Sequence, residues 1–486
     1  MLIGGSSAIN IVLGIIRTKI VAVILGPTGF GLQGLFNSIM ELAVSISGLG
    51  VGSSGVREVA AARESTDPTA TSRTVKALRL ACCILGSLGG ASLVLFAPYF
   101  SELTFNTPDY RWGVALLGSA VFFKMVANGE SAILQGFRRI GDISRASIYA
   151  GCISTITTIA VVYYWREAGI VPAIALTAAV SAVVTRWYLR GLLFDTPVTD
   201  RKDTIRRIQS LIHLGTAFMA SGLVAMASAY GIRIILTREL GLDAAGYYQA
   251  AWTIGGLYLG FVFQAMGADF YPRLTAVVQN HEEANRLVNE QAMISLLLGG
   301  PGILGTIAFS PIVIALFYSE EFASAVPMLR WICLGMALRV VAWPVGFMII
   351  AKARRDLIVF TEVAWGLTHL LSAWLCIELF GLNGAAFAFF FSYVVHSVLV
   401  YYLVRKLSGF RWSSDYFTVG SVFLVLIIAV FSATYFLPTI IASFIGIAGC
   451  LIASVYSLKM LLKLIGMANI PGPLKRVLPF FTKWLH

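Results

Sequence analysis

Long apolar stretches are the feature of this sequence that most constrains its fold. A helix needs about 20 mostly apolar residues to cross the hydrocarbon core of a bilayer. The apolar runs do not alternate with a period of two, which argues against the strands of a membrane β-barrel. We therefore predict an all-α polytopic membrane protein with about fourteen spans, near residues 3–25, 32–55, 80–99, 113–134, 147–164, 169–189, 211–236, 246–268, 292–317, 328–350, 358–379, 383–403, 416–436 and 440–462.

The scarcity of charged residues supports this prediction. Hydrophobic residues make up 58% of the chain and charged residues 12%, whereas a soluble domain has about 25% charged residues. So little charge cannot cover the surface of a water-soluble protein of 486 residues, and we expect no soluble domain. The net charge of +12 is typical of basic loops on one side of a membrane. We therefore expect the lipid bilayer, and not nucleic acid, as a partner.

The placement of the basic residues predicts the orientation of the chain. With a cytoplasmic N-terminus, the outer connections contain only four cations, and every other Lys or Arg of the connections and the tail falls on the inner side. Cytoplasmic loops are enriched in Lys and Arg. We therefore predict that both termini are cytoplasmic; the four outer cations are Arg111, Arg166, Arg238 and Arg330.

An internal repeat divides the chain. Leu25, Gly26 and Gly31 recur 215 residues later, and the pair Arg138 and Arg139 recurs after 216 residues. Six spans per copy is an even number, so both copies have the same topology, as in transporters whose two lobes rock around a central site. The prediction is two six-helix lobes, residues 1–209 and 210–411, related by a pseudo-two-fold axis along the membrane normal. Residues 412–486 add two helices and an interfacial cytoplasmic tail.

Four cations inside the spans are paired by this repeat. Arg17 corresponds to Arg233, and Lys124 to Arg339. Charges at this depth usually face a bundle interior or a water-filled cavity, although long side chains also extend to the headgroups. We predict that these four residues line one central cavity that binds an anionic group, because Arg offers a planar set of donors to phosphate oxygens. Lys19 is more consistent with extension to the headgroups.

Acidic and histidine residues inside the spans are candidates for ion coupling. Coupling requires a carboxylate or imidazole that titrates or binds the ion. The alternative for each is a salt bridge or a hydrogen bond between helices. The candidates are Glu41, Glu130, Glu362 and His369, with His396 as a further intramembrane histidine.

Familiar catalytic motifs do not occur in the sequence. It contains no GxxxxGK[ST] phosphate loop and no HExxH, GxSxG or CxxC pattern. We therefore expect a protein that is not an enzyme and that needs no cofactor or metal.

Two segments of the first spans have a recognisable pattern: Lys19 to Leu32, KIVAVILGPTGFGL, and Gly50 to Ala60, GVGSSGVREVA. The first, which is the more specific, resembles the first extracytoplasmic turn of the Wzx-type O-antigen flippases of the multidrug/oligosaccharidyl-lipid/polysaccharide superfamily. The second is similar to the end of that family's second helix. Further similar segments are Gln135 to Arg138, Phe270 to Leu274 and Gly346 to Lys352. The resemblance covers roughly residues 15 to 405.

The resemblance implies a fold and an activity. Members of the family have two six-helix lobes, often with two further helices. They move undecaprenyl-pyrophosphate-linked oligosaccharide repeat units from the cytoplasmic to the periplasmic leaflet of the bacterial inner membrane by alternating access, in lipopolysaccharide biosynthesis. The implied substrate is a lipid-linked oligosaccharide, and polymerase and chain-length proteins of the same pathway are implied partners.

Three alternatives remain open. A multidrug exporter of the same superfamily should line its cavity with acids, whereas basic residues predominate here. A flippase for the peptidoglycan lipid precursor shares the fold and an anionic substrate, and only the segment Lys19 to Leu32 favours the O-antigen family. A membrane glycosyltransferase or polymerase should have a large outer loop or an acidic catalytic motif, and the outer loops predicted here are short.

Overall fold

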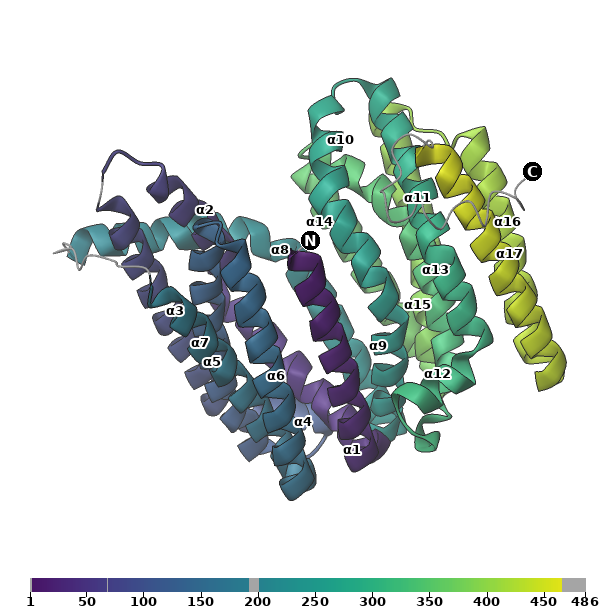
Figure 1. The fold of residues 1–486 in the computed structure, drawn as a ribbon. Coiled ribbons are helices and arrows are strands. Elements are labelled where there is room, and N and C mark those ends of the chain that lie inside the picture. The colour runs from purple at the N-terminus through teal and green to yellow at the C-terminus, as the bar shows by residue number, and fades with distance from the viewer. Residues whose placement is uncertain (1, 68, 192–200, 466–486) are drawn as a thin grey trace. The chain divides into compact units, whose positions relative to one another are not determined.

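The computed structural model describes residues 2–67, 69–191 and 201–465, and it is built from α-helices with short 3-10 and π turns. No strand occurs in these ranges, which confirms the all-α prediction. The predicted tail beyond residue 465 lies outside the described residues. Figure 1 shows the helices, which are α1 (Leu2–Gly48), α2 (Val51–Arg63), α3 (Ala70–Leu95), α4 (Ala97–Phe105), α5 (Arg111–Gly136), α6 (Ile140–Trp165), α7 (Ile170–Leu189), α8 (Arg201–Leu240), α9 (Leu242–Ala265), α10 (Tyr271–Val277), α11 (His281–Ala308), α12 (Ser310–Phe317), α13 (Ala325–Ala351), α14 (Arg355–Phe380), α15 (Leu382–Ser408), α16 (Ser414–Phe436) and α17 (Thr439–Ile465).

The chain forms two compact units. Unit 1 contains the residues up to Gln249 together with Ala315–Phe322, and unit 2 contains Ala250–Ile314 and the residues from Ala323 onward. The predicted lobe boundaries at residues 209 and 411 stay a prediction, because compactness alone does not define the two copies of a repeat.

The long element α1 is broken within its length. Gly26 has a φ of +66°, which only glycine adopts readily, and Pro27 follows it without a backbone N–H. The break separates the two spans predicted at 3–25 and 32–55. The second of these ends earlier than predicted, at Gly48, because Leu49 and Gly50 both have positive φ values before α2 begins.

Ten segments within the described ranges are long and apolar enough to cross a membrane. Two of them, Gly5–Gly48 and Ile140–Leu189, have 44 and 50 residues. At 1.5 Å per residue these lengths exceed twice the hydrocarbon thickness of about 30 Å, and breaks at Gly26 and around Arg166–Gly169 divide them. The predicted spans at 211–236 and 246–268 are not among the ten. The chain is a multi-pass membrane protein, and the count of fourteen spans stays a prediction.

Glycine allows close helix packing in unit 1. Helices α3, α5 and α7 lie side by side (Figure 1). A Cβ atom on Gly90 of α3 would lie 2.6 Å from the carbonyl oxygen of Gly118 on α5, and the reverse distance is also 2.6 Å. The backbones therefore meet at a separation that only glycine permits. Leu78 of α3 and Leu117 of α5 belong to the buried aliphatic core of the same unit.

Unit 2 is built around α13, which packs on α11 and α15, while α14 also packs on α15. Aromatic rings fill the space left by glycine. A Cβ on Gly335 of α13 would meet the ring of Phe389 at 2.5 Å, and one on Gly300 of α11 would meet the ring of Phe423 at 2.1 Å. The second contact attaches α16 to unit 2, so these glycines explain how large rings fit between adjacent helices.

The repeat found in the sequence has a counterpart in the backbone. Positive φ values occur in pairs separated by 215 residues: Gly26 and Gly241, Arg138 and Ala353, and Arg166 and Gly381. At the second pair the turns have the same hydrogen bonds, since the N–H groups of Arg138 and Ala353 donate to the carbonyls of residues 135 and 350, each at 2.9 Å. Residues 215 positions apart therefore adopt the same turn conformations in the two halves of the chain.

Candidate functional site

After the break at Gly26, one face of α1 carries a row of mostly polar side chains, together with a methionine and a valine. Gln33, Asn37, Met40, Glu41 and Val44 occur at positions i, i+4, i+7, i+8 and i+11, a spacing that places them on the same side of a helix. In an otherwise apolar span, such a row requires a neighbouring space that contains water or a polar ligand.

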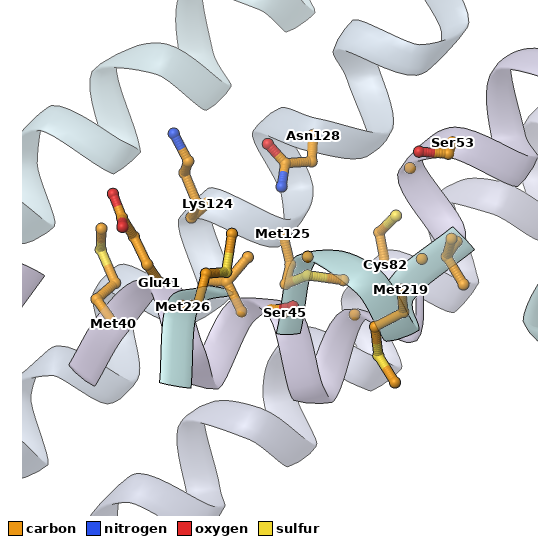
Figure 2. A pocket seen from close by; sticks show the side chains of 16 residues that line it. Met40, Glu41, Ser45, Ser53, Cys82, Lys124, Met125, Asn128, Met219 and Met226 are labelled. Carbon is orange, nitrogen blue, oxygen red and sulfur yellow. The ribbon is translucent and has the colours of Figure 1, made fainter. Parts of the chain in front are cut away.

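Helices α5 and α8 contribute polar and methionine side chains that face this row. Lys124 and Asn128 lie one turn apart on α5, and Met219 and Met226 lie two turns apart on α8. These side chains surround a cavity of about 510 Å³ within unit 1. Figure 2 shows Lys124, Asn128 and Met125 of α5 around this cavity with residues of α1, α3 and α8. Glu41 also lines it, as do small residues of the α1–α2 turn.

A second, smaller cavity of about 140 Å³ lies beside the first. Arg17 comes from the first half of α1, Lys124 from α5, and Thr177 and Ser181 from α7. Met40 and Lys124 line both cavities. The structure therefore brings two of the four predicted cations, Arg17 and Lys124, to the same cavity.

These two cations have no bonded partner in the described ranges. Neither Arg17 nor Lys124 makes a hydrogen bond or an ion pair there, although Arg17 is half-buried. Glu41 likewise has no ion-pair partner in the same ranges. Cationic groups at membrane depth that other side chains do not neutralise remain available to bind an anion.

Three residues that line the cavities are not among the residues predicted from the sequence. Gln33, Asn37 and Asn128 are uncharged, and the prediction considered only ionisable residues. The signal that identifies them is the four-residue spacing of amides within apolar helices, which places Gln33 with Asn37 and Asn128 with Lys124.

Arg233, the third predicted cation, has a different environment. It is buried, and its Nε and Nη2 donate to the Oε1 of Gln249 at 3.0 and 2.7 Å. Its Nη1 donates to the carbonyl of Ala229 at 2.9 Å, and its guanidinium carbon lies 5.9 Å from the ring centre of Tyr248. Arg233 does not line either of the two cavities. Its two bonds to Gln249 connect α8 to α9.

Glu130 is the most buried of the acidic candidates, with 2% of its surface exposed. Arg79 of α3 donates to both of its carboxylate oxygens, with its Nη2 at 2.9 Å, and Arg186 of α7 donates to Oε1 at 2.6 Å. This geometry matches the salt-bridge alternative for Glu130. The carboxylate joins α3, α5 and α7, and a role in ion coupling stays a prediction.

The fourth cation, Arg339, lies in unit 2 among aromatic rings. Its guanidinium carbon is 4.4 Å from the ring centre of Trp343 and 5.2 Å from that of Phe263. Its buried Nε has no hydrogen-bond partner in the part of the chain that the structure describes. The same holds for the Nε1 of Trp365 and for both ring nitrogens of His369, which is 1% exposed.

Glu362 and His396 also belong to this part of unit 2. Glu362 is close enough to Arg339 to interact electrostatically, and the ring of His396 lies 5.7 Å from that of Tyr393. Arg339, Glu362 and His396 therefore lie near one another. His369 is connected to them through the rings of Trp365 and Phe389, which contact both His369 and Tyr393. No group of three or more His, Cys, Asp or Glu residues with metal-binding geometry occurs in the described ranges.

Comparison with known proteins assigns the chain to a family. The profile of the polysaccharide biosynthesis protein family matches residues 2–278, more than half of the chain. The chain belongs to the polysaccharide biosynthesis protein family. This membership confirms the relationship that the segment Lys19 to Leu32 and the other motifs indicate.

Two curated relatives of this family member cover most of its length. A putative O-antigen transporter of Shigella flexneri is 23% identical over 79% of this chain and 91% of that protein. The lipid III flippase of Escherichia coli is 22% identical over 80% of this chain and 94% of that protein.

A solved structure has the same fold as this polysaccharide biosynthesis protein. The lipid II flippase MurJ in an inward closed conformation superposes with a TM-score of 0.72, over 94% of this chain and 99% of that one, at 15% identity. At this identity the likeness concerns the fold alone, and it confirms a polytopic helical fold.

Proposed function

We propose that this protein is a flippase for undecaprenyl-pyrophosphate-linked oligosaccharide repeat units, as in O-antigen and related polysaccharide synthesis. The observation that carries the proposal is the cavity of unit 1, in which Arg17 and Lys124 have no partner among the described residues. A pyrophosphate cannot cross hydrocarbon unaided, and such cations would replace part of its hydration. The named relatives, a putative O-antigen transporter and a lipid III flippase, support the same substrate class.

The two cations have distinct roles in this proposal. Arg17 offers a planar fork of donors that suits two phosphate oxygens at once, and Lys124 a mobile point charge between the two cavities. Arg233 orients α8 and α9 through Gln249. Arg339 supplies positive charge in unit 2, and its role in engaging the pyrophosphate remains part of the proposal.

The cellular setting completes the proposal. The chain resides in the bacterial inner membrane with both termini in the cytoplasm, it acts by alternating access, and it catalyses no chemical reaction. The polymerase and the chain-length protein of the pathway are its proposed partners on the periplasmic side. Glu41, Glu362 and His369 are the proposed ion-coupling residues, and Glu130 is a weaker candidate because two arginines neutralise it.

The competing functions predict different cavities. A multidrug exporter that takes up cations requires uncompensated acids, whereas two cations and one acid, Glu41, line the two cavities that share Lys124. The flippase for the peptidoglycan precursor has a pyrophosphate substrate as well. The two flippase functions are therefore distinguished by the sugars transported and not by the phosphate site.

Reconstituted protein provides the test. Proteoliposomes should transfer fluorescent undecaprenyl-pyrophosphate-linked oligosaccharide between leaflets, and Arg17→Ala or Lys124→Ala should reduce the rate at least tenfold, since a charged hydrogen bond contributes about 1.5–3 kcal/mol. Arg111→Ala is the matched control, because Arg111 begins α5, the helix of Lys124, and lies outside both cavities. Equal rates in the three variants, or no transfer by the wild type, would contradict the proposal.

A further inference from the structure

Five of the eleven residues that line the smaller cavity of unit 1, of about 140 Å³, carry uncharged polar groups. Gln33 and Asn37 supply amides from α1, and Thr158, Thr177 and Ser181 supply hydroxyls from α6 and α7. Amides and hydroxyls both donate and accept hydrogen bonds. A phosphate would use only their donors and a lipid chain would use neither, whereas a sugar hydroxyl uses both.

The amides of this cavity are available to a ligand. Gln33 and Asn37 make no hydrogen bond within the described ranges, and both are half-buried. The hydroxyl of Ser181 donates to the carbonyl of Thr177 at 2.9 Å, which leaves its oxygen able to accept. Unpaired amides inside a membrane span are costly unless a ligand or water completes their hydrogen bonds.

The size of the cavity limits the ligand. Its volume is about 140 Å³, well below the roughly 300–1,000 Å³ of pockets that enclose drug-sized molecules. A whole oligosaccharide repeat unit does not fit in this space, and a single sugar ring is the appropriate scale.

The position of the smaller cavity indicates which sugar of the lipid-linked oligosaccharide would occupy it. Arg17 and Lys124 line it together with the amides, and Lys124 also borders the larger cavity. A ring beside the two cations is therefore the ring that carries the phosphate. The larger cavity has methionines at Met40, Met125, Met219 and Met226, flexible side chains that suit groups of varying shape.

We propose that Gln33, Asn37, Thr177 and Ser181 form a subsite that binds the sugar attached directly to the pyrophosphate. This inference rests on the proposed flippase function and deepens it, because it assigns selectivity for the first sugar to α1 and α7. Recognition of the remaining sugars is then left to the adaptable larger cavity. A site that hydrogen-bonds a specific hydroxyl discriminates strongly against ligands that lack it.

Binding measurements on the purified full-length protein test the subsite. The probes are bare undecaprenyl pyrophosphate and the same lipid carrying one hexose, one N-acetylhexosamine or one 6-deoxyhexose. The wild type should bind at least one sugar-bearing lipid more tightly than the bare lipid. Gln33→Leu and Asn37→Leu should each weaken binding of that lipid about 3- to 10-fold, the range for one neutral hydrogen bond, with binding of bare pyrophosphate unchanged.

The controls separate the subsite from the phosphate site. Ser38→Ala, on α1 next to Asn37 but outside the cavity, should leave all four affinities unchanged. Arg17→Ala should weaken all four together. If no sugar increases the affinity above that of the bare lipid, or if the leucine variants weaken bare pyrophosphate equally, the sugar subsite is refuted. If the wild type binds no pyrophosphate lipid, the proposed function itself fails.

Discussion

The predicted cations of this membrane protein occupy three different environments. Arg17 and Lys124 line a cavity without partners in the described ranges, Arg233 is bonded to Gln249, and Arg339 lies among aromatic rings. Hydropathy predicts that all four lie within membrane spans, and their depth in the bilayer stays a prediction. The sequence did not predict their partners, since Gln249 lies sixteen residues from Arg233 on the next helix and is an ordinary polar residue in the sequence.

Replacing Arg233 and Arg17 should have opposite effects on stability. Arg233→Ala removes three hydrogen bonds from a buried guanidinium and should cost about 2–3 kcal/mol. Arg17→Ala removes a half-buried cation that has no partner in the described ranges, and it should leave the melting temperature unchanged or raised. Thermal unfolding in detergent measures both. A larger loss for Arg17 would contradict the assignment of Arg17 as a ligand-binding group.

Glu130 should prove to be a structural residue. Glu130→Gln leaves Arg79 and Arg186 without their carboxylate and should cost about 2–3 kcal/mol, near the lower end for a broken buried pair because both arginines are partly exposed. Transport per folded molecule should keep its dependence on an ion gradient. Loss of that dependence in a variant that melts like the wild type would instead assign Glu130 to coupling.

At the scale of helices, apolar length and glycine predicted most of the fold. The repeat glycines Gly26 and Gly241 have positive φ values, and their partners Gly31 and Gly246 meet each other within unit 1. The sequence showed that these positions recur. It did not show that they are in contact, because the number of residues between two positions does not give their distance in space. It also placed the second span to residue 55, since hydropathy does not detect the left-handed turn at Gly50.

The contact of Gly31 with Gly246 should be intolerant of any side chain. A Cβ on Gly246 would lie 2.0 Å from the carbonyl oxygen of Pro27, which is backbone and cannot rotate away. Gly246→Ala should therefore cost more than about 2 kcal/mol, as overpacking does. Gly346→Ala is the control, because that glycine of α13 has open space around it and should gain slightly from helix propensity. Equal melting temperatures for the two variants would show that α1 and α9 do not meet there.

At the scale of the whole molecule, each unit has its own set of buried polar groups. In unit 1 the buried Arg233 and Glu130 are paired. The half-buried Arg17 and the exposed Lys124 line cavities of the same unit. In unit 2 four polar residues lie among aromatic rings: Arg339, Glu362, His369 and His396. The backbone turns of the two halves of the chain therefore recur, whereas the environments of their polar side chains differ. The proposed function accordingly assigns pyrophosphate binding to Arg17 and Lys124 of unit 1, and ion coupling in unit 2 stays a prediction.

The orientation of the chain can be measured directly. Reporter fusions after Asp109, Glu239 and Glu320 should locate to the periplasm, and fusions after Asp67 and Asp203 to the cytoplasm, because Lys and Arg concentrate on the inner side. An inverted result at two or more of these positions would contradict the predicted topology.

Coupling to an ion gradient should depend on the cluster of unit 2. The buried ring nitrogens of His369 and the Nε of Arg339 have no hydrogen-bond partner in the described ranges, and each such group costs about 1–3 kcal/mol. A cluster with this cost is expected to titrate or bind during transport. Glu362→Gln should therefore abolish the stimulation of lipid transfer by a proton gradient, while pyrophosphate binding in unit 1 is retained.

Glu378→Gln, at the exposed end of the same helix α14, is the matched control and should respond as the wild type does. Undiminished stimulation in both Glu362→Gln and His369→Gln would contradict a coupling role for these two residues. The remaining candidates would then be Glu41, which lines the larger cavity, and the arginine-paired Glu130.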